Sequence, residues 1–415
     1  MRPHFFRKLA IACVETLLFP IGYINGFFSR NRNLWAFGSW RGERFADNPK
    51  HLFLYLLDRT DAPRCIWISG SRLIVRTMRS AGLPAVYQYS IRGLYLSARA
   101  NVFVFDSHSA DVSRRFSRGA FLVNTWHGIP LKKIEADIDH RASAFTRMTG
   151  GTWWSRTFWQ FFRPEVSEQC DLIVSTSPEV SVRMASAFRV PTTRIAETGL
   201  PRNDCLLSAR ASHDPCTDED SAVRRRIDSI RSAGGRVILY MPTFRDAGGA
   251  SAPLDWGILN DVLEETNCAL LCKLHPLDSS GLNLPRGLSR IHRLSPSLDV
   301  YPLLKDVDAL ATDYSSVFFD FLILNRPILF LAHDLQEYLL TCRGLYSTYE
   351  DSTPGPRAYS IDECMGLVRA YCEERLPDYS DARAIALQLL HTHVDGSASE
   401  RLHNEVSRRL RAAGR

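Results

Sequence analysis

The 415-residue sequence lacks the glycine-rich patterns that mark the common nucleotide-binding folds. It has no GxxxxGK[ST] loop and no kinase-like motif set, which disfavours hydrolysis of ATP or GTP, and no GxGxxG dinucleotide fingerprint. Internal repeats and low-complexity tracts are also missing, which argues against solenoid and fibrous architectures. With 45% hydrophobic and 23% charged residues, the composition is that of a globular protein with a large core.

Paired cysteine spacing is absent as well. The ten cysteines are scattered, and only Cys268 and Cys272 lie close together, without a second Cys or His pair to complete a zinc site. Reduced and mostly buried thiols are expected, as in a cytosolic protein. Carboxylates near the candidate site described below are few, and cationic side chains can replace Mg²⁺ there. We therefore expect no obligatory metal and no cofactor.

The N-terminus has no uninterrupted hydrophobic run. Residues 9–28 are apolar, but Glu15, Pro20 and Asn25 interrupt them. Basic residues stand on both sides of the stretch, so charge gives no direction for crossing a membrane. We expect residues 1–30 to lie in the plane of an anionic membrane surface, on its cytoplasmic face; a first helix packed on the domain is the alternative. No small-residue cleavage site follows, so we expect no removed signal peptide.

Short apolar runs alternate with amphipathic segments along the chain. A first series predicts strands at 64–70, 85–90, 101–106 and 120–128. A second series predicts strands at 170–176, 237–242, 269–275, 308–313 and 327–332. Helical patterns between several of them indicate βαβ units and mostly parallel sheets. The economical interpretation is an α/β protein with two doubly wound units.

The chain length fits two domains rather than one core. The polar stretch 207–236 contains a loop and then an Arg-rich amphipathic helix, and is the predicted join between the domains. We therefore expect an N-terminal segment at 1–30, domains at 31–206 and 207–375, and terminal helices at 376–415. A cleft between the domains is the expected place for a ligand.

Polar side chains follow several predicted strands, where ligands bind in open α/β sheets. His127 ends one strand, and Gly128 after it allows a tight turn or close approach of a ligand. Thr243 and Arg245 follow another strand, and His275 ends a third. Each of these alone is weak, because a single strand-end histidine is more often structural or solvated. Together they indicate a site for phosphate-containing substrates.

The stretch "ATDYSSVFFDFLILN" at 311–325 joins a predicted strand to a predicted helix. Ser315 and Ser316, just after Asp313, are expected at the helix cap and first turn. Free backbone N–H groups and the positive end of the helix dipole make an anion site there, and phosphate is the natural ligand. An ordinary serine cap is the alternative. Asp320 lies one turn beyond Ser316, where its carboxylate can accept hydrogen bonds from sugar or polyol hydroxyls.

These stretches together resemble the CDP-glycerol glycerophosphotransferase family, the teichoic-acid primases and polymerases that also occur in capsule loci. The resemblance is carried by "TWHGIPLKKI" (125–134), "TSPEVSVRMASAFRVPTTRIAETGLPRND" (176–204), "ILYMPTFRD", "KLHP", "DVYPLLKDVDALATDYSSVFFDFLILNRPILFL" (299–331) and "YEDSTPGP" (349–356), which occur in the family's order. It implies a GT-B-like fold, in which two Rossmann-type doubly wound domains face each other across a cleft and the C-terminal one holds the CDP donor. The N-terminal domain then faces the acceptor.

The resemblance also implies the reaction and its residues. A hydroxyl of a lipid-linked or polymer acceptor attacks the β-phosphate of CDP-glycerol, and CMP leaves. His127 and His275 match the catalytic histidines, and Arg245, Ser315 and Ser316 match the contacts to donor phosphate. Further expected substrate contacts are Gly128, Thr243, Asp313 and Asp320. Which histidine is the base stays open. CDP-ribitol is the rival donor, and a nucleotide-sugar glycosyltransferase or a non-catalytic membrane adaptor on the same fold are the other candidates.

The stretch 150–165 interleaves Trp and Phe with Arg, a composition that suits the bilayer interface. A lid over the cleft and a helix packed on the other domain are the alternatives. The net charge of +6 comes with mostly arginine basic residues, which suit phosphate recognition but equally match a GC-rich genome. No nucleic-acid-binding module accompanies them, so we expect no nucleic-acid partner. Peripheral attachment to the membrane is the expected location.

Overall fold

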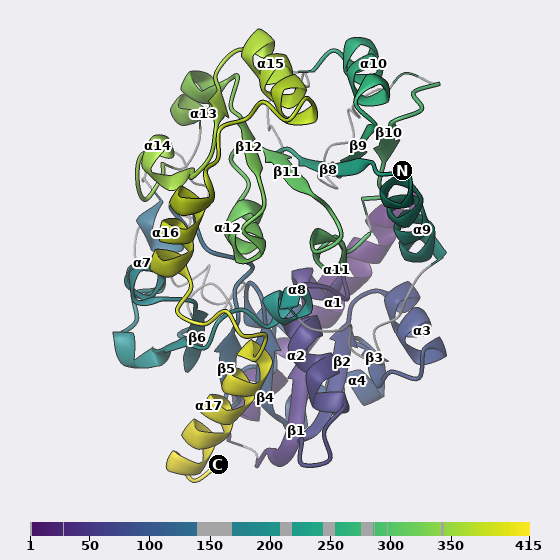
Figure 1. The fold of residues 1–415 in the computed structure, drawn as a ribbon. Helices are drawn as coiled ribbons and strands as arrows, with labels where there is room; N and C mark the ends of the chain where they lie inside the picture. The colour runs from purple at the N-terminus through teal and green to yellow at the C-terminus, as the bar shows by residue number, and fades with distance from the viewer. Residues whose placement is uncertain are drawn as a thin grey trace.

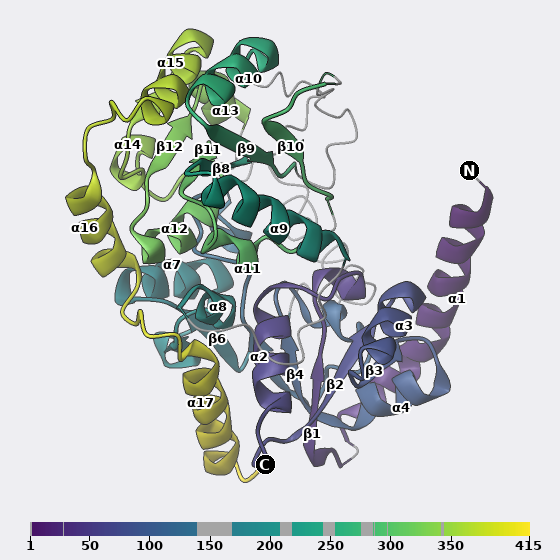
Figure 2. The same ribbon diagram turned by 45° about the vertical axis from the view of Figure 1, so that its right-hand side comes forward.

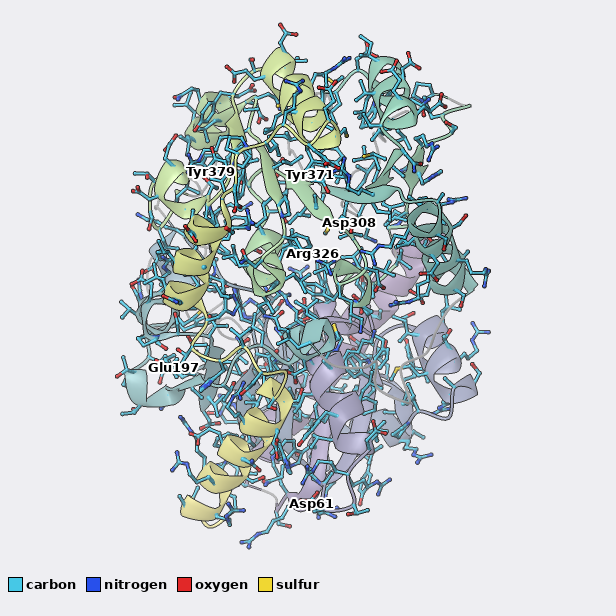
Figure 3. The ribbon with its side chains drawn as sticks, viewed as in Figure 1. Asp61, Glu197, Asp308, Arg326, Tyr371 and Tyr379 are labelled. Carbon is cyan, nitrogen blue, oxygen red and sulfur yellow. The ribbon has the colours of Figure 1, made fainter. Side chains whose placement is uncertain are left out.

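The computed structural model describes residues 2–27, 29–138, 168–207, 218–243, 254–274, 285, 287–296, 298–341 and 344–415. Two parallel sheets form two lobes, one above the other in Figure 1. Asp61 and Glu197 lie in the lower lobe, whereas Asp308 and Arg326 lie in the upper one (Figure 3). The predicted α/β class with two doubly wound units is confirmed.

The first lobe contains a seven-stranded parallel sheet in the order β3-β2-β1-β4-β5-β6-β7. Its strands are β1 (Asn31–Phe37), β2 (Arg64–Ser69), β3 (Ala85–Tyr87), β4 (Ala100–Phe105), β5 (Phe121–Asn124), β6 (Leu172–Ser175) and β7 (Ile195–Glu197). Its described helices are α1 (Arg2–Asn25), η1 (Trp40–Gly42), α2 (Asp47–Leu57), α3 (Arg72–Ser80), α4 (Ile91–Arg99), η2 (Ser109–Asp111), η3 (Glu135–Asp137), α7 (Pro178–Phe188), η5 (Thr192–Arg194), η6 (Pro201–Asn203) and α8 (Asp204–Leu207). The strand order reverses between β1 and β4.

The second lobe repeats this arrangement with six parallel strands in the order β10-β9-β8-β11-β12-β13. The strands are β8 (Arg236–Met241), β9 (Cys268–Cys272), β10 (Ile291–Arg293), β11 (Ala309–Thr312), β12 (Ile328–Leu331) and β13 (Arg357–Ala358). The described helices are α9 (Asp218–Ser232), α10 (Trp256–Glu265), α11 (Tyr301–Leu304), α12 (Val317–Phe321), η7 (Leu322–Leu324), α13 (Leu335–Thr341), α14 (Tyr349–Ser352) and α15 (Ile361–Cys372). Here the order reverses between β8 and β11.

The last two helices return the chain from the second lobe to the first (Figures 1 and 2). Arg383 of α16 (Ser380–Leu390) donates to the side chain and backbone carbonyl of Asn325 in the second lobe. Helix α17 (Ala398–Ala412) packs Leu402, Val406 and Leu410 into the core of the first lobe. The C-terminal segment predicted as helices therefore packs against both lobes.

Short strands were the weak point of the prediction. The run predicted as a strand at 120–128 is a strand only in β5, and residues 125–128 leave the sheet as a loop. The pattern also missed β1, β7, β10 and β13. Three of these have only two or three residues, too few for an alternating or apolar run to stand out.

Helix α1 packs its second half against the first lobe. Glu15 is buried and forms an ion pair with Arg115, with 2.9 Å between Oε2 and Nε, and the Tyr89 hydroxyl donates to it at 3.1 Å. Gly22 lies so close to Arg115 that a Cβ there would stand 2.3 Å from the Arg115 carbonyl oxygen. Glu15, which interrupts the apolar run, therefore fixes α1 to the first lobe, in agreement with the alternative of a first helix packed on the domain.

Another part of α1 is exposed and apolar. Leu17, Ile21 and Ile24 follow one another at helical spacing, and Leu17 is 74% exposed. Phe27, just beyond the helix, is 86% exposed. No helix within the described residues combines the length and the apolar character needed to cross a membrane.

Candidate active site

The topology places the predicted site residues at the switch point of the second sheet. Strands β8 and β11 are adjacent and parallel, with Met241 opposite Thr312. Connections leave neighbouring strands to opposite faces at such a point, which opens a crevice beyond their carboxyl ends. Thr243 follows β8 there, and Ser315 and Ser316 follow β11. The predicted neighbours are therefore brought to one edge.

Asp313 joins these two strand ends. Its side chain is buried, and the backbone N–H of Thr243 donates to both carboxylate oxygens, at 2.8 and 3.1 Å. The hydroxyl of buried Tyr349 donates to the Asp313 carbonyl at 2.9 Å. The carboxylate thus orders the backbone at the switch point. A direct contact between Asp313 and a substrate stays a prediction.

Ser316 is the N-cap of α12, and Ser315 precedes the helix, so the helix begins one residue later than the predicted cap and first turn at Ser315 and Ser316. The Ser316 side chain makes no capping hydrogen bond, and both Ser315 and Ser316 are half-buried rather than packed inside the lobe. The α-helix is shorter than expected, because the chain tightens into the 3₁₀ turn η7 at Leu322 and ends at Asn325 in a left-handed conformation. The two serines therefore lie at the border of the lobe rather than in its core.

His127 lies on a strained turn after β5. Trp126 and Gly128 on either side have φ values of +51° and +131°, and the second of these favours glycine. The His127 ring is exposed, and its Nδ1 stands 3.0 Å from the Asp106 carbonyl oxygen. Because a carbonyl only accepts, Nδ1 must carry the proton and donate. In the neutral ring Nε2 is then left as the base.

The electrostatics keep that ring neutral. The surrounding protein limits hydration of the imidazolium and lowers the pKa of His127 below its ordinary value of 6.5, although the Asp47 carboxylate opposes this. A lowered pKa means that Nε2 is unprotonated at neutral pH.

Gly128 brings the two lobes together. A Cβ at this position would stand 2.7 Å from Nη2 of Arg202 and 3.4 Å from Oγ of Ser316. Only a residue without a side chain fits between them. Gly128, next to His127 in the first lobe, therefore lies close to Ser316 at the start of α12 in the second lobe.

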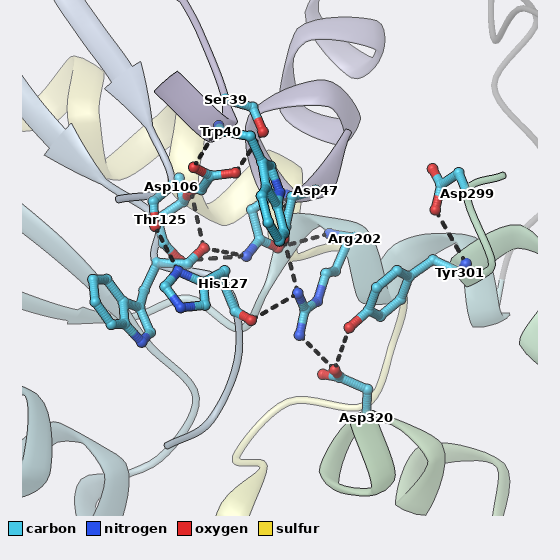
Figure 4. Close-up of polar contacts among 12 residues, drawn as sticks. Ser39, Trp40, Asp47, Asp106, Thr125, His127, Arg202, Asp299, Tyr301 and Asp320 are labelled. Carbon is cyan, nitrogen blue, oxygen red and sulfur yellow. Dashed lines mark hydrogen bonds and ion pairs between the residues drawn. The ribbon is translucent and has the colours of Figure 1, made fainter. Parts of the chain in front are cut away.

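Arg202 lies beneath this contact and was not predicted. It is 1% exposed, and its Nη1 donates to Asp47 at 2.8 Å and to the His127 carbonyl at 3.0 Å (Figure 4). Its Nη2 donates to Asp320 of α12 at 2.6 Å. Burial disfavours the charged guanidinium, but the Asp320 and Asp47 carboxylates outweigh it and raise the pKa of Arg202. One cation thus ties the His127 turn to the donor-side helix.

Asp320 has partners other than those expected. It is fully buried, and its Oδ2 accepts from Arg202 and, at 3.1 Å, from the Tyr301 hydroxyl, whose ring lies under the guanidinium. Its Oδ1 is buried and has no hydrogen-bond partner among the described residues. The carboxylate faces the lobe junction, and contact with hydroxyls of a substrate stays a prediction.

Further contacts close the junction. Lys50 of α2 pairs with Asp299, which precedes α11, at 2.7 Å. Asn48 donates to the Trp126 carbonyl at 2.8 Å and accepts from the Arg202 backbone N–H at 3.1 Å. Arg202 lies in "GLPRND" (199–204), one of the stretches that carry the family resemblance, so its motif was visible in the sequence. Nothing in the sequence gave its partners.

Two predicted residues, Arg245 and His275, lie outside the described residues, as does the aromatic stretch 150–165. In the part of the chain that is described, no group of three or more His, Cys, Asp or Glu side chains is placed to hold a metal ion.

Fold and site together define a class: two doubly wound lobes whose strand ends carry a histidine turn on one side and a serine-capped helix on the other. The profile of the CDP-glycerol:poly(glycerophosphate) glycerophosphotransferase family matches residues 23–408. The chain belongs to this family, and it is a glycerophosphotransferase. The predicted resemblance is confirmed.

Individual relatives agree. The chain is 30% identical to a teichoic acid glycerol-phosphate transferase of Staphylococcus aureus (strain NCTC 8325 / PS 47), over 90% of this chain and 92% of the relative. It is 31% identical to a teichoic acid poly(glycerol phosphate) polymerase of Bacillus spizizenii, over 80% and 82% of the two chains.

Solved structures share the fold. The wall teichoic acid polymerase TagF superposes with a TM-score of 0.72 at 24% identity, covering 100% of this chain and 99% of that chain. A UDP-GlcNAc 2-epimerase of Neisseria meningitidis superposes with a TM-score of 0.51 at 11% identity, covering 90% and 99%. The two-lobed GT-B-like architecture is thus common to proteins with different reactions, and the fold by itself does not define the substrate.

Proposed function

We propose that the protein transfers glycerol phosphate from CDP-glycerol to a hydroxyl of a membrane-linked acceptor and releases CMP, at the cytoplasmic face of the membrane. The observation that carries the proposal is the close approach of Gly128 to Ser316, because it sets the His127 turn beside the start of α12. A nucleophile-activating group and an anion site then share one substrate.

The donor pyrophosphate is proposed to lie at the carboxyl ends of β8 and β11. Ser315 and Ser316 supply hydroxyl donors there, and Thr243 lies on the adjacent strand end. Backbone order from Asp313 supports this assignment, because a preformed set of donors costs no reorganisation when charge develops on the phosphates. Arg245 and His275 keep their proposed roles as a phosphate contact and as a stabiliser of the leaving CMP.

His127 is proposed as the general base. Its Nε2 takes the proton of the acceptor hydroxyl, whose oxygen forms a bond to the β-phosphorus of the donor. The bond from that phosphorus to the oxygen bridging the two phosphates breaks, and CMP leaves with the electron pair. The tautomer set by the Asp106 carbonyl supports this role. The division into an acceptor-side domain at 31–206 and a donor-side domain at 207–375 is part of the proposal.

A donor screen tests the reaction. Purified protein with a membrane acceptor fraction is expected to release CMP from CDP-glycerol and to extend the acceptor by glycerol phosphate, measured by nucleotide chromatography and mass spectrometry. Reactions without acceptor are the control. CMP release from CDP-ribitol but not from CDP-glycerol would show that CDP-ribitol is the donor. Nucleotide release from a sugar donor alone would identify a glycosyltransferase. No release from any donor would favour a non-catalytic adaptor.

The exposed residues of α1 are proposed to contact the membrane that carries the acceptor. Leu17, Ile21 and Phe27 are each more than half exposed, while Glu15 fastens the helix to the lobe. An amphipathic helix held in this way can insert its apolar face at headgroup depth without spanning the bilayer. This is the in-plane arrangement that the sequence predicted for residues 1–30.

Replacing Leu17, Ile21 and Phe27 by serine is expected to weaken binding to anionic lipid vesicles by about tenfold or more, because the apolar area that enters the interface is lost. Co-sedimentation with phosphatidylglycerol vesicles measures it. Ile385→Ser is the matched control, since Ile385 is 68% exposed on α16. Equal binding of the triple variant and the wild type would contradict a membrane contact through α1.

A further inference from the structure

A basic cavity of about 540 Å³ lies on the second lobe, between α9 and the start of β10. Arg225 and Arg226 line it from the helix, and Arg290 and His292 line it from the strand side. We infer that this cavity binds an anionic chain of phosphodiester units, the polymer that serves as acceptor or product. The inference rests on the proposed function for the identity of the chain, and on the cavity for its place.

The local sequence explains why these arginines point outward. Val223 and Ile227 are buried and fix the inner face of α9. Arg224 and Arg231 turn toward the lobe and pair with Asp306 and Asp308, at 2.5 and 2.9 Å. The remaining basic residues, together with Ala222, Ser229 and Ile230, lie on one helical face at spacings of three and four residues. That face forms one wall of the cavity.

The cavity has an excess of positive charge. Arg225 and Arg226 are exposed and form no ion pair with any described residue. Arg290 is half-buried, and its guanidinium contacts only a neutral acceptor in the described part of the chain, Oδ1 of Asn267, at 3.2 Å. Acidic groups of the same region are Asp228 on α9 and Glu264, which accepts from Ser289 on the rim and interacts electrostatically with Arg290. Three arginines against these two carboxylates leave donors for an anionic ligand.

The arginines affect the protonation of His292 in the cavity. Burial, together with the charges of Arg226 and Arg290, lowers the pKa of His292 to about 4. The ring is therefore neutral at pH 7, and offers a hydrogen bond rather than a further charge. A bound phosphate group would neutralise part of this positive potential and accept charge-assisted hydrogen bonds from the arginines.

The position favours a polymer over a second nucleotide site. Ser289 and Arg290 precede β10, so the cavity lies toward the amino end of this strand, whereas the proposed donor site lies at the carboxyl ends of β8 and β11. Residues one helical turn apart have Cβ atoms about 5–6 Å apart, so Arg225 and Ser229, four positions apart, can contact successive groups of an extended ligand, and Arg226 adds a second charge to the same wall.

The position also disfavours a lipid headgroup. In Figure 1 the N-terminus overlaps α9, but the view in Figure 2 separates α9 from α1. The cavity is therefore not beside the helix proposed to contact the membrane. An anionic membrane surface and a phosphodiester chain share the same chemistry, and the experiment below distinguishes them.

The test uses the full chain with Arg225→Gln and Arg226→Gln combined. Binding of a fluorescently labelled poly(glycerol phosphate) oligomer, measured by anisotropy, is expected to weaken at least tenfold. Arg72→Gln with Arg76→Gln, which removes the same charge from exposed positions on α3, is the matched control and is expected to bind like the wild type. CMP release with a single-unit acceptor is expected to be unchanged, which shows that the variant folds and that its donor site is intact.

The outcomes separate the two proposals. Wild-type protein that releases no CMP from CDP-glycerol contradicts the proposed function, whatever binds in the cavity. Normal CMP release combined with unchanged oligomer binding in the double variant overturns the cavity assignment alone. So does a variant that loses binding to single-stranded RNA or to phosphatidylglycerol vesicles but keeps the oligomer. At equal total CMP release, glycerol phosphate spread by the variant over more acceptor molecules, with fewer units on each, would support it.

Discussion

Replacement of His127 by alanine is expected to lower turnover by about 10²–10⁴-fold, the range for removal of a general base. The exposed ring has Nδ1 held by the Asp106 carbonyl, so the proton-accepting Nε2 is lost with the ring. Steady-state CMP release from CDP-glycerol measures the effect. The Michaelis constant for the donor is expected to change less than turnover, because the phosphates are held by the other lobe.

His393→Ala is the matched control, since His393 is a half-buried histidine at a distance in the sequence from both strand-end sites. Circular dichroism of the His127 variant should match that of the wild type. Turnover within a few-fold of wild type in a folded His127→Ala protein would rule out this residue as the base. His275 would then be the candidate.

The same assignment predicts a pH dependence. A base acts when it is unprotonated, and the pKa of His127 lies below 6.5 because its surroundings disfavour the charged ring. Wild-type turnover is therefore expected to persist as the pH falls through 6.5, and to decline only at more acidic pH. The residual activity of His127→Ala should lack that acidic limb. A wild-type limb centred above 6.5 would contradict the direction of the shift.

Replacement of Arg202 by methionine is expected to destabilise the protein by about 3–5 kcal/mol, the cost of removing one partner from a buried ion pair. The change leaves the Asp47 and Asp320 carboxylates facing each other in the interior with no cation between them. It also removes a donor from the His127 carbonyl. Urea denaturation followed by tryptophan fluorescence measures the loss.

Two controls sharpen this experiment. Arg231→Met removes a half-exposed partner of Asp308 and is expected to cost about 0–1 kcal/mol. A triple variant, Arg202→Met with Asp47→Asn and Asp320→Asn, removes every charge of the network and is expected to recover much of the stability, because no carboxylate is left uncompensated. Its turnover should stay low, since the His127 turn has still lost its donor. Wild-type stability in the single variant would show that the guanidinium does not hold the lobes.

The candidate site could be predicted in part because its rules are local. Ser316 as the cap of α12 and Gly128 as a position of close approach each depend on a few neighbouring residues. The placement of both at strand ends follows from the doubly wound pattern, which parallel strands and helices impose. Thr243 beside β11 follows from the same rule.

The Arg202 network could not be predicted, because its members are far apart in the chain. Arg202 and Asp47 are separated by 155 positions, and Arg202 and Asp320 by 118. A buried arginine between two carboxylates leaves no periodic pattern in the sequence. Asp320 illustrates the consequence: its position one turn beyond Ser316 was clear, but its partner came from the other lobe.

The sequence by itself determined the alternation of strands and helices, the two doubly wound units and the polar residues at their strand ends, because these depend on apolar periodicity and on short-range backbone chemistry. Only the tertiary structure decided which of those residues meet. The close approach of Gly128 to Ser316 and the choice of Arg202 as the cation between the lobes require two lobes to pack against each other, and that geometry is set by the whole core.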